Sequence, residues 1–172
     1  MREFNLLENY PNPKNPRLVN SKLRTIENRI LASYRDINLY DGDRNNGYGG
    51  FVYDGRWVKI AKKICEEYIL NSNSSFLHIG CEKGFLMHDM HGLYPKMKIV
   101  GLETSQYAIN KSMPSIKKNI IHSGYINLNM FKDNSDYLSI LIKNNQFTLK
   151  IINNFSSNFN GVFRNYDINI NF

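Results

Sequence analysis

FLHIGCEKGF, residues 76–85, joins a run of mostly apolar residues to a loop that contains two glycines and a lysine. The run predicts a short strand at 76–79, buried on both faces as in the centre of a parallel sheet. Residues 84–93 then carry apolar side chains at helical spacing and end near Gly92 and Pro95, which predicts a helix. A strand, a tight turn and a helix in this order often form a nucleotide pocket.

Two further helices are expected before this strand. Residues 21–34 carry apolar side chains at helical spacing. Residues 57–70 carry a second apolar stripe, and Asp54 offers an N-cap for it. NSNSS at 71–75 interrupts this stripe just before the strand. We therefore expect the second helix to pack on a sheet.

A second strand is predicted at KIVGL, residues 98–102, and it ends in Glu103. Ser105 follows as the expected cap of a helix that runs toward Met113. The chain thus alternates between helix and strand. This order predicts the α/β class, with a Rossmann-like, doubly wound, mostly parallel sheet and helices on both of its faces.

The pattern weakens after Pro114, because thirteen of the 54 residues from Asn119 onward are asparagine. Asparagine disfavours both strands and helix interiors. We expect the sheet to be incomplete at its C-terminal edge, with short strands at 119–122, 137–142 and 147–152.

The length of 172 residues, 42% of them hydrophobic, suits a single domain with one sizeable core. We expect this domain over residues 1–172, divided into an N-terminal arm, helix and aromatic segment (1–55), a core (56–142) and a tail without an assignment (143–172).

The formal net charge of +7 raises nucleic acid as a partner. The excess is spread, however, with three positive charges in residues 1–74 and four in 75–172, so a solvated surface is the preferred interpretation. No apolar run is long enough to span a membrane. The polar N-terminus lacks the apolar core of a signal peptide, which favours the cytoplasm. Cys65 and Cys81 indicate neither a disulfide framework nor a zinc site.

Two motifs resemble those of class I S-adenosylmethionine-dependent methyltransferases. FLHIGCEKGFLMHD at 76–89 resembles their first motif, a strand with an acidic residue followed by G-x-G-x-G. KIVGLETSQYAI at 98–109 resembles the second, in which a strand ends in an acidic residue and a helix follows. Residues 39–57, rich in glycine and aromatic side chains, resemble a segment of small bacterial-type members. The resemblance covers about residues 39–142, and the chain looks shortened at its C-terminus.

The resemblance implies S-adenosylmethionine as the cofactor. Glu103 is then expected to accept hydrogen bonds from both ribose hydroxyls, and the helix that begins near Gly84 to point its positive end at the carboxylate of the methionine part. The candidate residues of the cofactor-binding core are His78, Gly80, Cys81, Glu82, Gly84, Glu103, Thr104, Tyr53 and Arg56.

Two residues depart from the family pattern. His78 stands where an aspartate is usual, and Glu82 replaces the middle glycine, where a positive φ would be costly. The Glu82 carboxylate can face the ammonium group of the ligand, or its side chain can fill the site. The aromatic side chains of 39–57 can likewise form a lid over the sulfonium or simply complete the core. No residue is singled out as a catalytic base. His88, Asp89 and His91 indicate a solvated helix face rather than a metal site.

The expected function is methyl transfer to a small-molecule acceptor, such as a sugar or another metabolite. The alternative is a truncated or inactive relative that acts as a binding or scaffold protein. NAD or FAD is a weaker choice, because residues 80–84 lack the G-x-G-x-x-G spacing. Nucleic acid ranks last among the partners. An exposed sheet edge also allows a homo-oligomer.

Overall fold

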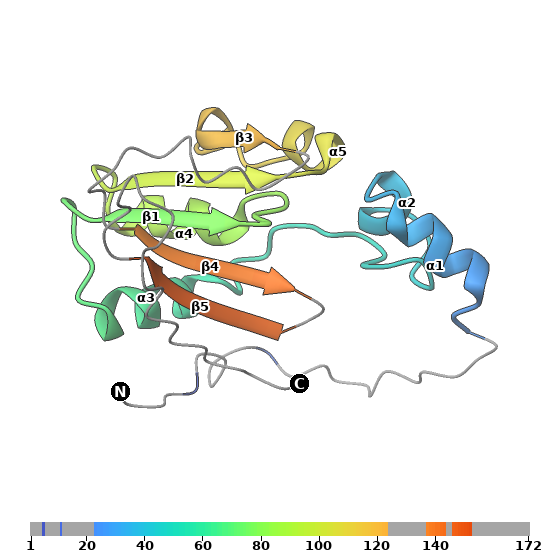
Figure 1. Ribbon diagram of the computed structural model, residues 1–172, viewed down its shortest axis with the longest axis horizontal. Coiled ribbons are helices and arrows are strands. Elements are labelled where there is room, and N and C mark those ends of the chain that lie inside the picture. Colours follow the sequence, from blue (N-terminus) through green and yellow to red (C-terminus); the bar gives the residue numbers. More distant parts are fainter. Residues whose placement is uncertain (1–4, 6–10, 12–22, 124–136, 144–145, 153–172) are drawn as a thin grey trace, which may run out of the picture.

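The structure is a computed structural model, and it describes residues 5, 11, 23–123, 137–143 and 146–152. Its centre is one five-stranded sheet with the order β3-β2-β1-β4-β5 (Figure 1). The strands are β1 (Ser75–Ile79), β2 (Lys98–Glu103), β3 (Ile120–His122), β4 (Tyr137–Lys143) and β5 (Gln146–Ile152). The first four run parallel, and β5 is antiparallel to β4.

This strand order confirms the predicted Rossmann-like, mostly parallel sheet. From β1 the chain moves outward to β2 and β3, and β4 then pairs with the other side of β1. The order therefore reverses next to β1, which is the place where doubly wound sheets bind their ligands. All five strands lie within one or two residues of the ranges that the sequence predicts.

The helices are α1 (Ile26–Ser33), α2 (Ile37–Tyr40), α3 (Val58–Glu67), α4 (Phe85–Leu93) and α5 (Gln106–Asn110), with a 3-10 turn, η1 (Lys117–Asn119). Ser105 caps α5 as predicted, because its side chain accepts a hydrogen bond from the backbone N–H of Ala108. The expectation that Asp54 caps α3 was wrong: the N-cap is Trp57, and Asp54 instead accepts hydrogen bonds from Arg56. The helix also ends before Ile69, which has a positive φ of 54° and is 84% exposed.

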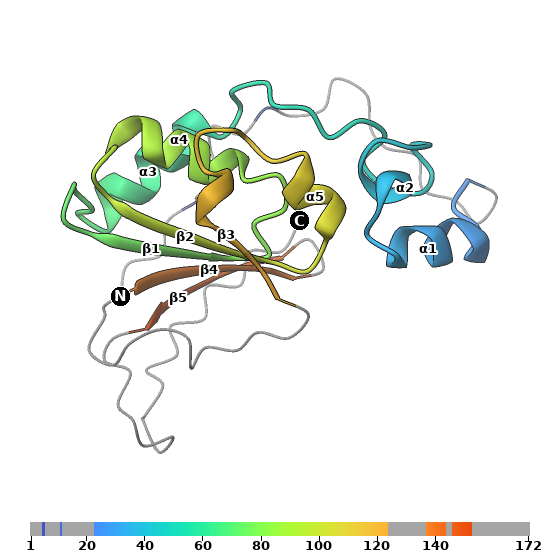
Figure 2. The same ribbon diagram turned by 90° about the horizontal axis from the view of Figure 1, so that it is seen from above.

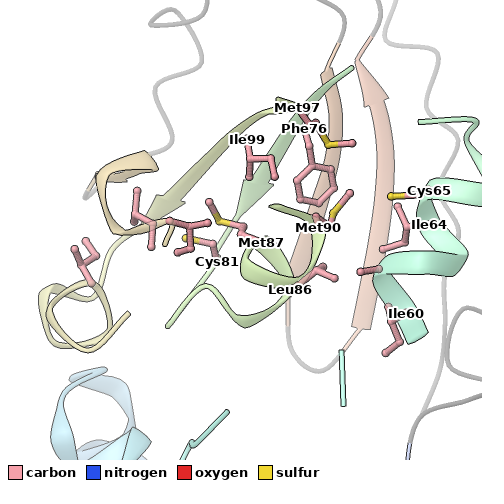
Figure 3. Packing of buried hydrophobic residues seen from close by; sticks show 14 residues of the cluster. Ile60, Ile64, Cys65, Phe76, Cys81, Leu86, Met87, Met90, Met97 and Ile99 are labelled. Carbon is pink, nitrogen blue, oxygen red and sulfur yellow. The ribbon is translucent and has the colours of Figure 1, made fainter. Parts of the chain in front are cut away.

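The main core lies between one face of the sheet and the helices α3 and α4. Figure 2 shows α3, α4 and α5 on the same side of the sheet. Figure 3 shows Met90 of α4 beside the ring of Phe76 of β1, Met87 near Cys81, and Ile60 and Ile64 of α3 in the same cluster. The opposite face carries a smaller buried group, Leu77, Ile79 and Leu102. Burial on both faces explains why β1 and β2 read as continuous apolar runs.

The N-terminal helix α1 does not contribute to this core. Its start is fixed by a capping box in which Thr25 and Asn28 exchange hydrogen bonds. None of its residues is buried, and Ile26 and Ile30 are exposed, so its apolar stripe faces away from the sheet. After α2, residues 41–57 lead back to the sheet, where α3 begins (Figures 1 and 2).

Gly101 lets α4 and the glycine loop lie close to β2. A Cβ at this position would come within 2.6 Å of Cys81 Sγ and 2.7 Å of Met87 Sδ. Both sulfur atoms belong to buried side chains of the main core. A larger residue would therefore push the loop and the helix away from the strand.

Gly101→Ala is accordingly expected to lower the free energy of unfolding by about 1–3 kcal/mol, because the added methyl overpacks the core. Gly92→Ala is the matched control, since a Cβ there meets no atom within 4 Å. It should raise stability by about 0.5–1 kcal/mol, the usual gain on replacing a helical glycine by alanine. Urea unfolding of both variants measures the difference, and equal effects would contradict this account of Gly101.

Candidate functional site

The glycine loop, residues 80–84, connects β1 to α4 and is fixed to the end of β2. The backbone N–H groups of Gly80 and Cys81 donate to the carbonyl of Leu102, at 2.8 and 3.2 Å. Gly80, Glu82 and Gly84 all have positive φ, at 73°, 53° and 73°. Glycine adopts this conformation without strain, whereas it is uncommon for glutamate. The loop therefore carries one strained residue between two relaxed ones.

Glu103, the last residue of β2, holds the loop and the following helix together. Its carboxylate accepts hydrogen bonds from the backbone N–H groups of Glu82 (2.7 Å), Thr104 (2.8 Å) and Ser105 (2.8 Å). The guanidinium of Arg35 adds an ion pair at 3.0 Å. The Glu103 side chain is fully buried, so these donors replace the water that it would otherwise bind.

The side chain of Glu82 turns toward the site. Its carboxylate accepts a hydrogen bond of 2.7 Å from the hydroxyl of Tyr48. Tyr48 belongs to residues 39–57, the aromatic segment. Burial raises the pKa of Glu82 to about 7, despite opposing effects of the Tyr48 hydroxyl and of Arg35. Near neutral pH the group is therefore poised between its neutral and ionised forms.

A small cavity lies beside the loop, and His78 faces it from β1. The cavity measures about 20 Å³ and is lined by Phe51, Trp57, His78, Gly80, Cys81, Glu82, Phe85 and Leu86. His78 is 3% exposed, and among the described residues neither of its ring nitrogens has a hydrogen-bond partner. Burial lowers its pKa to about 4, so the ring is neutral at pH 7. An unpartnered buried imidazole marks a place for a water molecule or a polar group of a ligand.

Lys83 joins the loop to the aromatic segment. It is 5% exposed, and its Nζ donates to both carboxylate oxygens of Asp41, at 2.8 and 2.7 Å, and to the carbonyl of Phe51 at 2.8 Å. The ammonium also lies 5.9 Å from the ring centroids of Tyr40, Phe51 and Tyr107. Asp41 thus has a structural role as the counter-ion of a buried lysine.

The aromatic segment packs over the loop as a continuous group of rings. Tyr48 and Phe51 stack at 4.4 Å between centroids, and Phe51 contacts Phe85 of α4 at 4.7 Å. Tyr40 lies 5.8 Å from Tyr48 and is fully buried. Tyr40 therefore belongs to the packed interior, whereas Phe51 and Trp57 line the cavity, and a lid over the sulfonium stays a prediction.

The structure brings most of the predicted site residues together. His78, Gly80, Cys81 and Glu82 line the cavity. Glu103 and Thr104 adjoin the loop, since Glu103 binds the N–H of Glu82 and Thr104 donates to Glu103. Gly84 precedes α4 as its N-cap. Their roles in cofactor binding stay predictions.

Two predicted residues lie elsewhere. The Tyr53 hydroxyl donates to Asp89 at 2.5 Å, and Arg56 forms an exposed ion pair with Asp54. Neither side chain lines the cavity. Three residues that the sequence analysis missed take part instead: Arg35, Lys83 and Phe85. Only Lys83 carried a signal, as a lysine placed between the loop glycines.

The fold and the geometry define an α/β domain of the Rossmann-like class, with a small cavity beside the glycine loop at the carboxyl end of β1. A family described as "Putative methyltransferase" matches residues 72–158, which include the glycine loop and Glu103. The chain belongs to this methyltransferase family. Membership confirms the resemblance to the class I S-adenosylmethionine-dependent enzymes and their cofactor, S-adenosylmethionine.

One solved structure similar to this chain is described as a "putative protein-L-isoaspartate O-methyltransferase beta-aspartate methyltransferase (PCMT) from Plasmodium falciparum in complex with S-adenosyl-L-homocysteine". The two share 14% sequence identity with a TM-score of 0.35, over 63% of this chain and 73% of that one. No curated protein matches the sequence.

The contact between Lys83 and Asp41 leads to a test of the aromatic segment. Asp41→Asn leaves a buried ammonium without a counter-ion and should lower the free energy of unfolding by about 3 kcal/mol. Asp54→Asn removes an ion pair with Arg56 in the same segment, where both side chains are more than 40% exposed, and should change stability by about 1 kcal/mol or less. Chemical unfolding of the two variants compares them, and an equal loss would mean that Lys83 does not anchor the segment.

The raised pKa of Glu82 predicts how stability varies with pH. Because the folded protein holds this proton more tightly than the unfolded chain, stability from Glu82 should fall as pH rises toward and through about 7. His78 has the opposite effect on stability, because its pKa is lowered in the folded protein. This effect lies mainly below pH 6.5, the ordinary pKa of histidine. Between pH 6.5 and 8 the wild type should therefore lose on the order of 1 kcal/mol through Glu82.

Thermal unfolding of wild type and Glu82→Gln over this pH window tests the assignment. The variant cannot ionise at this position and should show a flatter profile. A profile with the same slope as that of the wild type would show that another group titrates.

Proposed function

We propose that this protein binds S-adenosylmethionine between the glycine loop and Glu103 and transfers its methyl group to a small-molecule acceptor. The observation that carries the proposal is the position of Glu103, an acidic residue at the end of β2 with its carboxylate directed at the loop. Carboxylates in this place suit the two neighbouring hydroxyls of a ribose. The proposal includes a cytoplasmic location.

The chemical types of the residues around the cavity suit the methionine part of the cofactor, with its ammonium group and its sulfonium. His78 offers unpartnered ring nitrogens, and Glu82 offers a carboxylate that can ionise near pH 7. Both are suited to accept hydrogen bonds from an ammonium group. The rings of Phe51, Trp57 and Phe85 line the same cavity and offer faces that attract a cation. These contacts support the interpretation that the Glu82 carboxylate faces the ammonium group of the ligand, rather than the interpretation that its side chain fills the site.

The available space is smaller than this ligand. A cavity of about 20 Å³ holds about one water molecule, whereas pockets for ligands of this size measure hundreds of Å³. The aromatic segment covers the loop and contacts it through Tyr48 and Phe51. Binding therefore requires this segment to move outward.

When bound, S-adenosylmethionine supplies a methyl group activated by a sulfonium. The chain contributes chiefly by positioning, since methyl transfer is an in-line displacement that needs the acceptor to be aligned with that group. Phe51, Trp57 and Phe85 would keep water away from the reacting centre. The nucleophile would be an atom of the acceptor, the leaving group would be S-adenosylhomocysteine, and no side chain at the cavity is assigned as the base for the proton of the acceptor.

A second candidate is a relative that binds the cofactor or a partner without transferring a methyl group. The small cavity and the many donors already bound to Glu103 favour it. The two candidates differ in turnover, and both can be examined in one set of experiments.

The test is calorimetric titration with S-adenosylhomocysteine, followed by transfer from labelled S-adenosylmethionine to cell extract separated into low-mass and RNA fractions. Wild type should bind, and label should enter the low-mass fraction. Glu103→Gln should weaken binding at least tenfold, because a lost charge-assisted hydrogen bond has a cost of this order. Glu66→Gln, on the outer face of α3, is the control and should bind as wild type does.

Each outcome has a distinct meaning. Binding without transfer would support the second candidate. Label in RNA alone would overturn the small-molecule acceptor but keep the methyltransferase. Absence of binding by a folded wild type would overturn the proposed site. Circular dichroism of Glu103→Gln shows whether weaker binding reflects a lost contact or a lost fold.

A further inference from the structure

Arg35 reaches the ligand-facing end of the sheet from a distant part of the chain. It lies between α1 and α2, and its Nη2 contacts Glu103 Oε1 at 3.0 Å and the Tyr40 hydroxyl at 3.1 Å. The two charged residues are 68 positions apart in the sequence. The Arg35 side chain is 39% exposed and that of Glu103 is fully buried, so the arginine approaches the acid from the solvent side.

The contact fills the hydrogen-bonding capacity of one carboxylate oxygen. Glu103 Oε1 already accepts from the N–H groups of Thr104 and Ser105, both at 2.8 Å, before Arg35 is counted. Oε2 accepts from the N–H of Glu82. A carboxylate has room for about four strong donors. A ligand with two neighbouring hydroxyls therefore competes with Arg35 for Glu103.

The backbone at Arg35 is held in an unfavourable conformation. Its φ is 51°, a value that costs a residue other than glycine on the order of 1 kcal/mol. The carbonyl of Arg35 accepts a hydrogen bond from the Ser105 hydroxyl, and its side-chain Nε is buried without a hydrogen-bond partner among the described residues. The contact is thus made against local strain and leaves one donor unsatisfied, as expected of a contact that can be released.

The same stretch of chain makes several polar contacts that close the site. Arg35 binds Glu103, Asp41 binds Lys83, and Tyr48 binds Glu82. Each contact joins residues 35–51 to the glycine loop or to the end of β2. Displacement of Arg35 would therefore loosen the segment that covers the cavity.

We propose that Arg35 occupies the place of the ribose in the free protein, so that a ligand with a vicinal diol must displace it from Glu103 and thereby open residues 35–51. The inference rests on the proposed function, because it assigns the nucleoside end of that ligand to Glu103. Arg35 is then an internal competitor rather than a cofactor-binding residue.

This proposal predicts opposite effects on stability and on binding. Without the guanidinium, Glu103 keeps its backbone donors but loses its cation, so the free protein becomes less stable. A diol ligand no longer has to displace a charged partner, so it binds more tightly. A purely structural arginine would instead weaken both properties together.

The experiment titrates wild type and Arg35→Gln with S-adenosylhomocysteine, adenosine and 2′,3′-dideoxyadenosine, which lacks the diol. Arg35→Gln should lower the melting temperature of the free protein and tighten the binding of adenosine and S-adenosylhomocysteine about tenfold. The affinity for 2′,3′-dideoxyadenosine should rise clearly less, because this ligand gains only from the loosened segment and not from a freed Glu103. Arg29→Gln removes the same charge from the exposed α1 and should behave as wild type does. If Arg35→Gln does not fold, Arg35→Lys is the second variant, because it keeps the charge but lacks the planar guanidinium. It should tighten the binding of adenosine and S-adenosylhomocysteine by a smaller factor.

The outcomes separate this inference from the proposed function. Equal or weaker binding of S-adenosylhomocysteine by a folded Arg35 variant overturns the role of Arg35 and leaves the cofactor site standing. An equal gain for 2′,3′-dideoxyadenosine also overturns it, because the effect would not involve the diol. If neither the wild type nor the variant binds any of the three probes, both the inference and the proposed function fail.

Discussion

The buried carboxylate of Glu103 is the interaction on which the rest of the structure depends. It accepts hydrogen bonds from the backbone N–H groups of three residues, one in the glycine loop and two at the turn into α5. The loop after β1 and the turn after β2 are therefore both fixed to the end of β2. Hydrogen bonds to a charged acceptor are stronger than neutral ones, and burial protects them from competing water. Together with the hydrogen bonds from Gly80 and Cys81 to the carbonyl of Leu102, this side chain sets the distance between the loop and β2.

This constraint links the fold to the site. Because Glu82 donates its N–H to Glu103, its backbone is held at positive φ and its side chain is directed toward Tyr48. A glycine in this place would relieve the strain, but the cavity would then have the side chain of His78 without the carboxylate of Glu82. The protein thus places an ionisable group where the motif that it resembles has a glycine, and the imidazole of His78, which has no hydrogen-bond partner among the described residues, lines the same cavity.

The sequence predicted the parts of the fold that rest on local patterns. The strands β1 and β2 are continuous apolar runs, and Ser105 is a standard cap, so the predictions agree with the structure to within about a residue. The predictions that Asp54 caps α3 and that the helix includes Ile69 were wrong, because the same local patterns suit a turn as well as a helix. Arg35 gave no signal at all, since its conformation and its partner are set by a contact across 68 positions. The aromatic segment had two open interpretations, and only three-dimensional packing shows that Tyr40 is interior and that Phe51 and Trp57 line the cavity.

Lys83 has a consequence for any attempt to isolate the family region. Its ammonium is 5% exposed, and its counter-ion and carbonyl partner both come from residues before the region that matches the family. An excised fragment covering residues 72–158 would keep the lysine but lose Asp41, the Phe51 carbonyl and the rings that cover the ammonium, so that water would take their place. The glycine loop of such a fragment would therefore have a different environment from that of the whole chain, and experiments on the loop need residues 40–51 as well.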